Sequence, residues 1–135
     1  MTTLTDYIRN EFDAIWNAND PEAVLARFAD DAVVQSVPPL PGGPEAFRGK
    51  GEIRGFVQML IPNFHVESKN FAESGDTVTW YATVSSDTIR GQFGADSLSA
   101  DCEAVIQNGK VKLFKPVFTQ ASLAKLQASA AKQLA

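Results

Sequence analysis

The order of apolar and polar residues divides the chain into a mostly helical first half and a stranded second half. Up to about residue 60, apolar residues recur at intervals of three and four, the spacing of one helix face. From Phe64 onward they alternate with polar residues and are rich in β-branched and aromatic types, which favours strands. The pattern therefore predicts an α+β protein.

Three helices are expected in the first half. The first covers residues 6–18 and is capped by Thr3 or Thr5. The second covers residues 21–28, with Asp20 as its N-cap and Pro21 at its first position. The third ends before Pro62 and carries one apolar stripe: Ile53, Phe56, Val57 and Leu60.

A strand over residues 32–37 is expected between the second and third helices. It is followed by a segment rich in proline and glycine, residues 38–44, which can continue neither a helix nor a sheet interior. An irregular segment of this length in a small domain predicts a lid or another functional loop. A surface excursion without a ligand is the alternative.

The second half reads as a meander of four strands. They are expected over residues 64–71, 77–87, 96–107 and 110–118, joined by a turn at 73–76, a connection at 90–95 and an Asn108-Gly109 hairpin. A helix over residues 120–134 closes the chain.

Composition narrows the class of protein. A length of 135 residues predicts a single domain over residues 1–135. The net charge of −4 gives no electrostatic support for a nucleic-acid partner. The lone Cys102 excludes an internal disulfide and fits a reducing compartment. We find no signal-peptide pattern and no apolar run of membrane-spanning length, so we expect a cytoplasmic protein without a membrane partner.

Neither a metal nor a cofactor is expected. Asp30, Asp31 and Glu45 lack histidine partners and the spacing of metal ligands. Gly49-Lys50-Gly51 lacks the strand-then-helix context of a nucleotide-binding loop.

Three segments resemble the nuclear transport factor 2-like superfamily, which includes SnoaL-like polyketide cyclases and ketosteroid isomerase. They are FADDAVV, FRGKGEIRGF and the NGKV hairpin. The resemblance spans residues 4–118. It implies a cone-shaped fold in which three N-terminal helices pack on a curved antiparallel β-sheet, followed by a C-terminal helix. This fold hosts isomerases, cyclases, hydrolases and proteins without catalysis, so it leaves the reaction open.

No relative's complete set of catalytic residues is present at the matching positions of this sequence. Where ketosteroid isomerase has its aspartate base and its tyrosine, the resemblance places Ser36 and Phe12, and an alcohol is too weak a base at neutral pH. The aspartate of limonene epoxide hydrolase corresponds to Pro116. His65 does not match the histidine position of SnoaL-like cyclases. At the third catalytic position of ketosteroid isomerase, an aspartic acid, the resemblance places Asp101, so this residue type is retained.

Asp101 and Glu103 are therefore the candidate catalytic residues. The family register turns both carboxylates toward the cavity, where burial and their mutual repulsion would raise one pKa. Strand alternation alone favours the opposite, with the carboxylates facing solvent or a dimer interface. The buried face would then consist of Leu98, Ala100, Cys102, Ala104 and Ile106.

The resemblance and strand parity also predict a substrate pocket. Its expected lining is Phe12, Trp16, Ser36, Phe56, Trp80, Ala82, Val84, Phe114 and Phe118. We expect this pocket to bind a small cyclic or hydrophobic molecule, either as an isomerase- or cyclase-type enzyme of proton transfer or as a non-catalytic binding or assembly module. A homodimer is expected through the outer face of the meander, with Val78, Tyr81 or Leu98 as apolar contacts.

Overall fold

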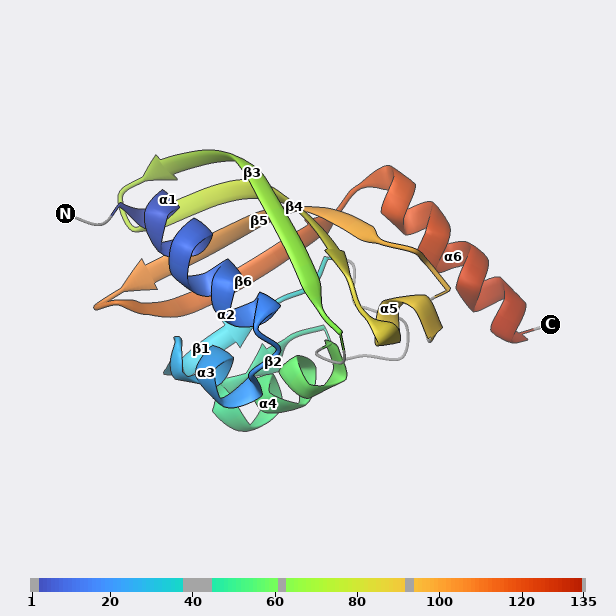
Figure 1. Cartoon of the computed structure of the whole chain (residues 1–135), viewed down its shortest axis with the longest axis horizontal. Coiled ribbons are helices and arrows are strands. Elements are labelled where there is room, and N and C mark those ends of the chain that lie inside the picture. The colour runs from blue at the N-terminus through green and yellow to red at the C-terminus, as the bar shows by residue number, and fades with distance from the viewer. Residues whose placement is uncertain (1–2, 38–44, 61–62, 92–93, 135) are drawn as a thin grey trace.

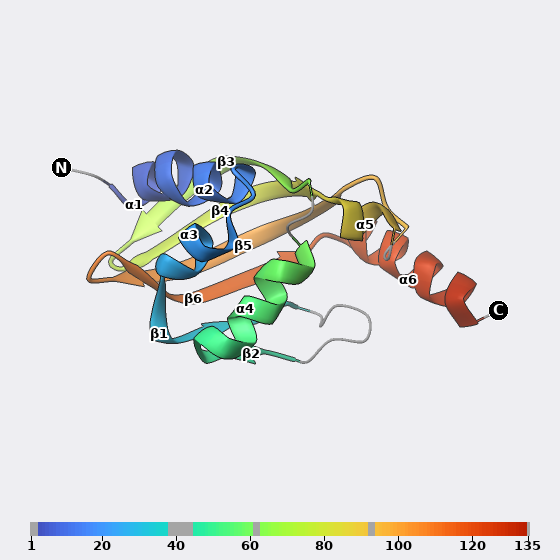
Figure 2. The same ribbon diagram turned by 60° about the horizontal axis from the view of Figure 1, so that its bottom comes forward.

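The computed structural model describes residues 3–37, 45–60, 63–91 and 94–134. One sheet contains the strands in the order β2-β1-β6-β5-β4-β3, and neighbours are antiparallel except β1 and β6, which run parallel. The sheet curves around the helices of the N-terminal half, and the last helix projects from one end (Figures 1 and 2). The predicted α+β architecture is confirmed.

The first helix contains a π-helical segment. It runs through α1 (Leu4–Asp6), η1 (Tyr7–Phe12) and α2 (Asp13–Asn17). The backbone N–H of Asp13 donates to the carbonyl of Ile8, five residues earlier. This wider turn holds one more residue than an α-helical turn, so it changes which side chains after it face the sheet. The predicted helix over residues 6–18 is thus present, but its interior is not regular.

Strand β3 (His65–Ser74) holds this helix at both ends. The Glu73 carboxylate accepts hydrogen bonds from the backbone N–H and the hydroxyl of Thr5 at 3.3 and 2.7 Å. At the other end, the Asn17 amide pairs with the N–H and the carbonyl of Val66 at 2.7 and 3.2 Å. These contacts fix α2 across the first residues of β3.

Helix α3 (Pro21–Ala26) ends two residues earlier than predicted, and β1 (Phe28–Val34) begins four residues earlier. Phe28 is a strand residue because it pairs with Val111 of β6. The register then shifts before Val33, which breaks the strict alternation that marks a strand in sequence.

Strand β2 (Phe47–Arg48) was not predicted, and two residues are too few to show a pattern. It pairs with β1 and leads into α4 (Gly49–Leu60), whose predicted stripe buries Ile53, Phe56 and Val57. The predicted lid over residues 38–44 lies outside the described residues.

The predicted meander is confirmed. It consists of β3, β4 (Thr77–Ser85), β5 (Leu98–Gln107) and β6 (Lys110–Phe118), with Asn108 and Gly109 at φ of 54° and 73° in the hairpin. Strand β4 ends two residues before the predicted limit. A short helix, α5 (Asp87–Gly91), begins there because the Ser86 hydroxyl accepts a hydrogen bond from the backbone N–H of Ile89.

The core lies between the sheet and the helices. Val78 and Leu98 belong to it, with exposed fractions of 0% and 2%. The prediction that they contribute to a dimer face is wrong for these two residues, because their strands turn them toward the helices. Helix α6 (Gln120–Leu134) joins the core through the buried Leu126, and its Ser122 hydroxyl accepts from the N–H of Ser99 at 2.7 Å.

Candidate functional site

A cavity of about 70 Å³ lies between α2, α4 and the inner face of the sheet. Its walls are apolar apart from the side chains of Asp13, Ser36 and Cys102 and the indole nitrogens of two tryptophans. The cavity is partly open, and the half-buried Leu60, Val84 and Phe118 are among its walls. The full lining is Phe12, Asp13, Trp16, Ser36, Phe56, Leu60, Phe64, Val66, Trp80, Ala82, Val84, Ile89, Leu98, Ala100, Cys102, Phe114, Pro116 and Phe118.

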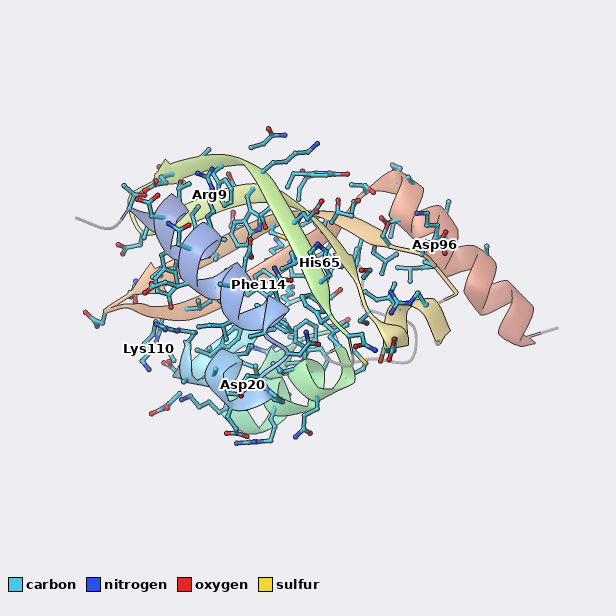
Figure 3. The ribbon with its side chains drawn as sticks, viewed as in Figure 1. Arg9, Asp20, His65, Asp96, Lys110 and Phe114 are labelled. Carbon is cyan, nitrogen blue, oxygen red and sulfur yellow. The ribbon has the colours of Figure 1, made fainter. Side chains whose placement is uncertain are left out.

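Aromatic rings form much of this wall. Trp80 and Phe114, from the non-adjacent strands β4 and β6, stack with ring centroids 6.0 Å apart. Phe12 meets the Phe114 ring edge-on at 5.7 Å, and Trp16 lies 4.8 Å from Phe64. Phe114 lies centrally, beneath the N-terminal helix in Figure 3. The small side chains of Ala82 and Ala100 leave space beside these rings.

Every residue predicted for the pocket lies around this cavity. Trp80, Ala82 and Val84 come from β4, Phe114 and Phe118 from β6, and the other predicted residues from the helices and the segment after β1. Alternation along each strand brings them to one face. That the cavity binds a substrate stays a prediction.

The orientation predicted for Asp101 and Glu103 is wrong. Along β5 the buried residues are Leu98, Ala100, Cys102, Ala104 and Ile106, so the two carboxylates project from the opposite face of the sheet. Asp101 is exposed and lies in a shallow depression of that outer face together with Glu103. Simple alternation describes this strand, and the register taken from the resemblance does not.

The carboxyl group at the cavity belongs to Asp13, which the sequence reasoning missed. Its exposed fraction is 9%. Removal from water penalises the charged form and raises the pKa of Asp13 from 3.8 to about 6. The Ser68 hydroxyl of β3 lies close enough to offset part of this rise, although it forms no hydrogen bond of normal geometry with the described residues.

A second polar group in the cavity wall is the indole of Trp16. This side chain is 3% exposed, and its Nε1–H has no hydrogen-bond acceptor among the described residues. A buried donor without an acceptor loses its bond to water and gains nothing in return. Asp13 and Trp16 thus combine a buried acid with an unpaired donor.

Cys102 is unsuited to act as a nucleophile. Burial and then the negative charges of Asp13 and Asp101 raise the pKa of its thiol well above the ordinary value. The thiolate is the reactive form, so the thiol is inert in the folded protein. Its position in the buried face of β5 agrees with the predicted core role.

A signal for Asp13 was present in the sequence. Asp13 directly follows Phe12 and precedes Trp16 by three residues, which puts it beside the apolar face of the first helix. The π-helical segment directly before Asp13 departs from the regular helical period, so the sequence pattern places Asp13 beside the apolar face without predicting its burial.

No cluster of three potential metal ligands occurs within the part of the chain that the structure describes. In the same residues, no helix is both long and apolar enough to span a membrane.

Comparison with known proteins identifies the family. A model of the SnoaL-like domain matches residues 8–112. No curated protein matches the chain by sequence.

Among solved structures, a nuclear transport factor 2-like protein of unknown function from Cytophaga hutchinsonii is 14% identical, with 92% of this chain and 96% of that chain covered and a TM-score of 0.68. A protein with a ketosteroid isomerase-like fold from Catenulispora acidiphila, in complex with trimethylamine, is 20% identical (89% and 92% covered, TM-score 0.66).

The epoxide hydrolase/cyclase-like enzyme SalBIII, with a role in pyran ring formation in the polyether salinomycin, is 14% identical (85% and 90% covered, TM-score 0.69). At these identities the similarity to solved structures concerns the fold alone. The family model covers most of the chain, and the chain therefore belongs to the SnoaL-like domain family.

Proposed function

We propose that the chain binds a small, mostly apolar cyclic molecule in the cavity between its helices and its sheet, and that it acts on this molecule by proton transfer of the isomerase or cyclase type. The observation that carries this proposal is the composition of the wall, in which aromatic and aliphatic side chains surround a few polar ones. Such walls are typical of small-molecule sites.

The size of the cavity restricts the ligand. A closed cavity of about 150 Å³ holds one benzene molecule, whereas this cavity measures about 70 Å³. A single ring therefore has to extend toward the open part of the cavity or displace the half-buried Leu60 and Phe118. A ligand of one ring fits this space better than a steroid-sized molecule.

The relatives support a small-molecule role without defining it. One neighbour in fold was crystallised with trimethylamine, and SalBIII has a role in forming a pyran ring. Both proteins share the architecture that creates the cavity. A cytoplasmic location remains our expectation.

Ligand binding can be measured by tryptophan fluorescence. The chain has two tryptophans, Trp16 and Trp80, and both line the cavity. Toluene is a suitable first probe because it is one apolar ring. Saturable quenching or a spectral shift is expected on titration.

A filled cavity supplies the matched test. Ala100→Leu adds three carbon atoms at the wall, and we expect it to abolish the toluene response. Ala72→Leu makes the same change at an exposed position of β3 and should leave the response intact. An unchanged response in Ala100→Leu, or no saturable response in the unmodified chain, contradicts binding in this cavity.

The second candidate function is a dimeric assembly module without catalysis. The outer face of the sheet carries Tyr81, Val105, Leu113 and Val117 among charged residues. Val117, 37% exposed, is the only exposed large hydrophobic side chain among the described residues. An apolar contribution to an otherwise solvated sheet face favours contact with a second copy.

A further inference from the structure

Two polar side chains of α2 meet at the cavity. Asp13 and Trp16 are three residues apart within one α-helical turn, which places them on the same helix face. Both line the cavity and both are at least nine-tenths buried. Their shared helix face and shared cavity are the geometric basis for one ligand group contacting both.

The protein around these two groups leaves hydrogen-bonding capacity unused. The Trp16 Nε1–H has no acceptor among the described residues, and Ser68 next to Asp13 has no hydrogen bond of normal geometry there. The described wall contains no lysine, arginine or histidine that could neutralise Asp13. The titratable group that faces Asp13 from β5 is Cys102, which keeps its proton, and β3 contributes the Ser68 hydroxyl.

We propose that Asp13 and Trp16 form a subsite for the hydroxyl group of a small ring molecule, in which the hydroxyl donates a hydrogen bond to the Asp13 carboxylate and accepts one from the Trp16 Nε1–H. This inference rests on the proposed function, because it places the polar end of the ligand in the same cavity.

A hydroxyl group fits this subsite better than an amine, a carbonyl or an apolar ring. A hydroxyl group is both donor and acceptor, so one oxygen atom satisfies both side chains. A protonated amine would pair with Asp13 and leave the Trp16 donor without an acceptor. A carbonyl oxygen would accept from Trp16 but could not donate to an ionised Asp13. An entirely apolar ring would leave the Trp16 donor unpaired and would offer Asp13 no hydrogen bond.

Phenol and toluene test the subsite, because they have the same shape and differ in the hydroxyl group. Burying a hydroxyl without a partner is unfavourable, so an apolar cavity alone prefers toluene. We expect the unmodified chain to bind phenol at least tenfold more tightly than toluene, as measured by calorimetry at pH 7.5. Phenol binding no tighter than toluene binding would overturn the subsite and leave the proposed function standing. If neither phenol nor toluene binds, both the subsite and the proposed function are overturned.

Variants locate the preference. Trp16→Phe removes the N–H and keeps an aromatic ring, and Asp13→Leu replaces the carboxyl with an apolar group of similar size. Each is expected to reduce the preference for phenol to threefold or less while toluene still binds. Asp13→Asn is expected to fold well and to lower the preference, because the hydrogen bond is no longer to a charged group. Retention of the tenfold preference in Asp13→Asn and Trp16→Phe would refute the assignment.

Two controls separate the remaining explanations. Asp96→Asn removes an exposed carboxylate at the edge of the molecule near α6 (Figure 3) and should keep the full preference for phenol. Benzylamine tests the cationic alternative. Tighter binding of benzylamine than of phenol would identify a cation site at Asp13 and overturn the hydroxyl assignment.

Discussion

Replacement of Asp13 with asparagine is expected to stabilise the folded protein at neutral pH. Burial raises the pKa of Asp13 from 3.8 to about 6, which means that the fold favours the protonated carboxyl group. The stability that this group contributes is fully present below pH 3.8 and is lost as the pH rises through about 6. Asparagine resembles the neutral acid at every pH, so the variant avoids the cost of a buried charge.

The magnitude follows from the size of the shift. Each pKa unit corresponds to about 1.4 kcal/mol, so a shift of about two units costs the ionised protein about 3 kcal/mol. For a chain of this length, that free energy corresponds to roughly 10 °C in the thermal midpoint. At pH 4 most of the cost has disappeared, and the two proteins should differ little.

Thermal unfolding of both proteins at pH 4 and pH 7.5 measures this difference. The other carboxylates are common to both proteins, and their titration cancels in the comparison. A stability gap of about 3 kcal/mol at pH 7.5 that shrinks at pH 4 is expected. Asp96→Asn, an exposed aspartate, serves as the control and should show no such dependence. A gap that is the same at both pH values would refute the reasoning, as would a carboxyl resonance of Asp13 that titrates near 4.

Four further outcomes are expected. Asp101→Asn should change the free energy of unfolding by less than about 0.5 kcal/mol at either pH, because Asp101 is exposed; a larger, pH-dependent effect would restore its cavity role. Sedimentation at micromolar concentration should show a dimer, and a species of 14.6 kDa would contradict the predicted interface. Deletion after Lys125 removes the buried Leu126 and should cost about 2 kcal/mol, so an unchanged midpoint would make the rest of α6 a dispensable tail. Cys102 should resist thiol reagents until the protein unfolds, and rapid labelling of the native state would contradict its burial.

The sequence alone determined the class of fold and most of its elements. The alternation over β4, β5 and β6 and the Asn108-Gly109 turn are local signals, because neighbouring residues in a strand face opposite sides and a tight turn needs positive φ. Periodicity likewise found the buried stripe of α4. The resemblance then grouped the residues that line one cavity, although they come from separate parts of the chain.

The tertiary structure decided which carboxyl group reaches the cavity. The side of the sheet to which β5 turns Asp101 depends on its register with β4 and β6, and the resemblance assigned that register incorrectly. The buried Asp13 directly follows a π-helical segment, and the contacts of Glu73 and Asn17 hold its helix against β3. These are long-range contacts or local irregularities, which a pattern of apolar and polar residues does not encode. The acidic group of the site is therefore Asp13 on the first helix and not Asp101 on the sheet.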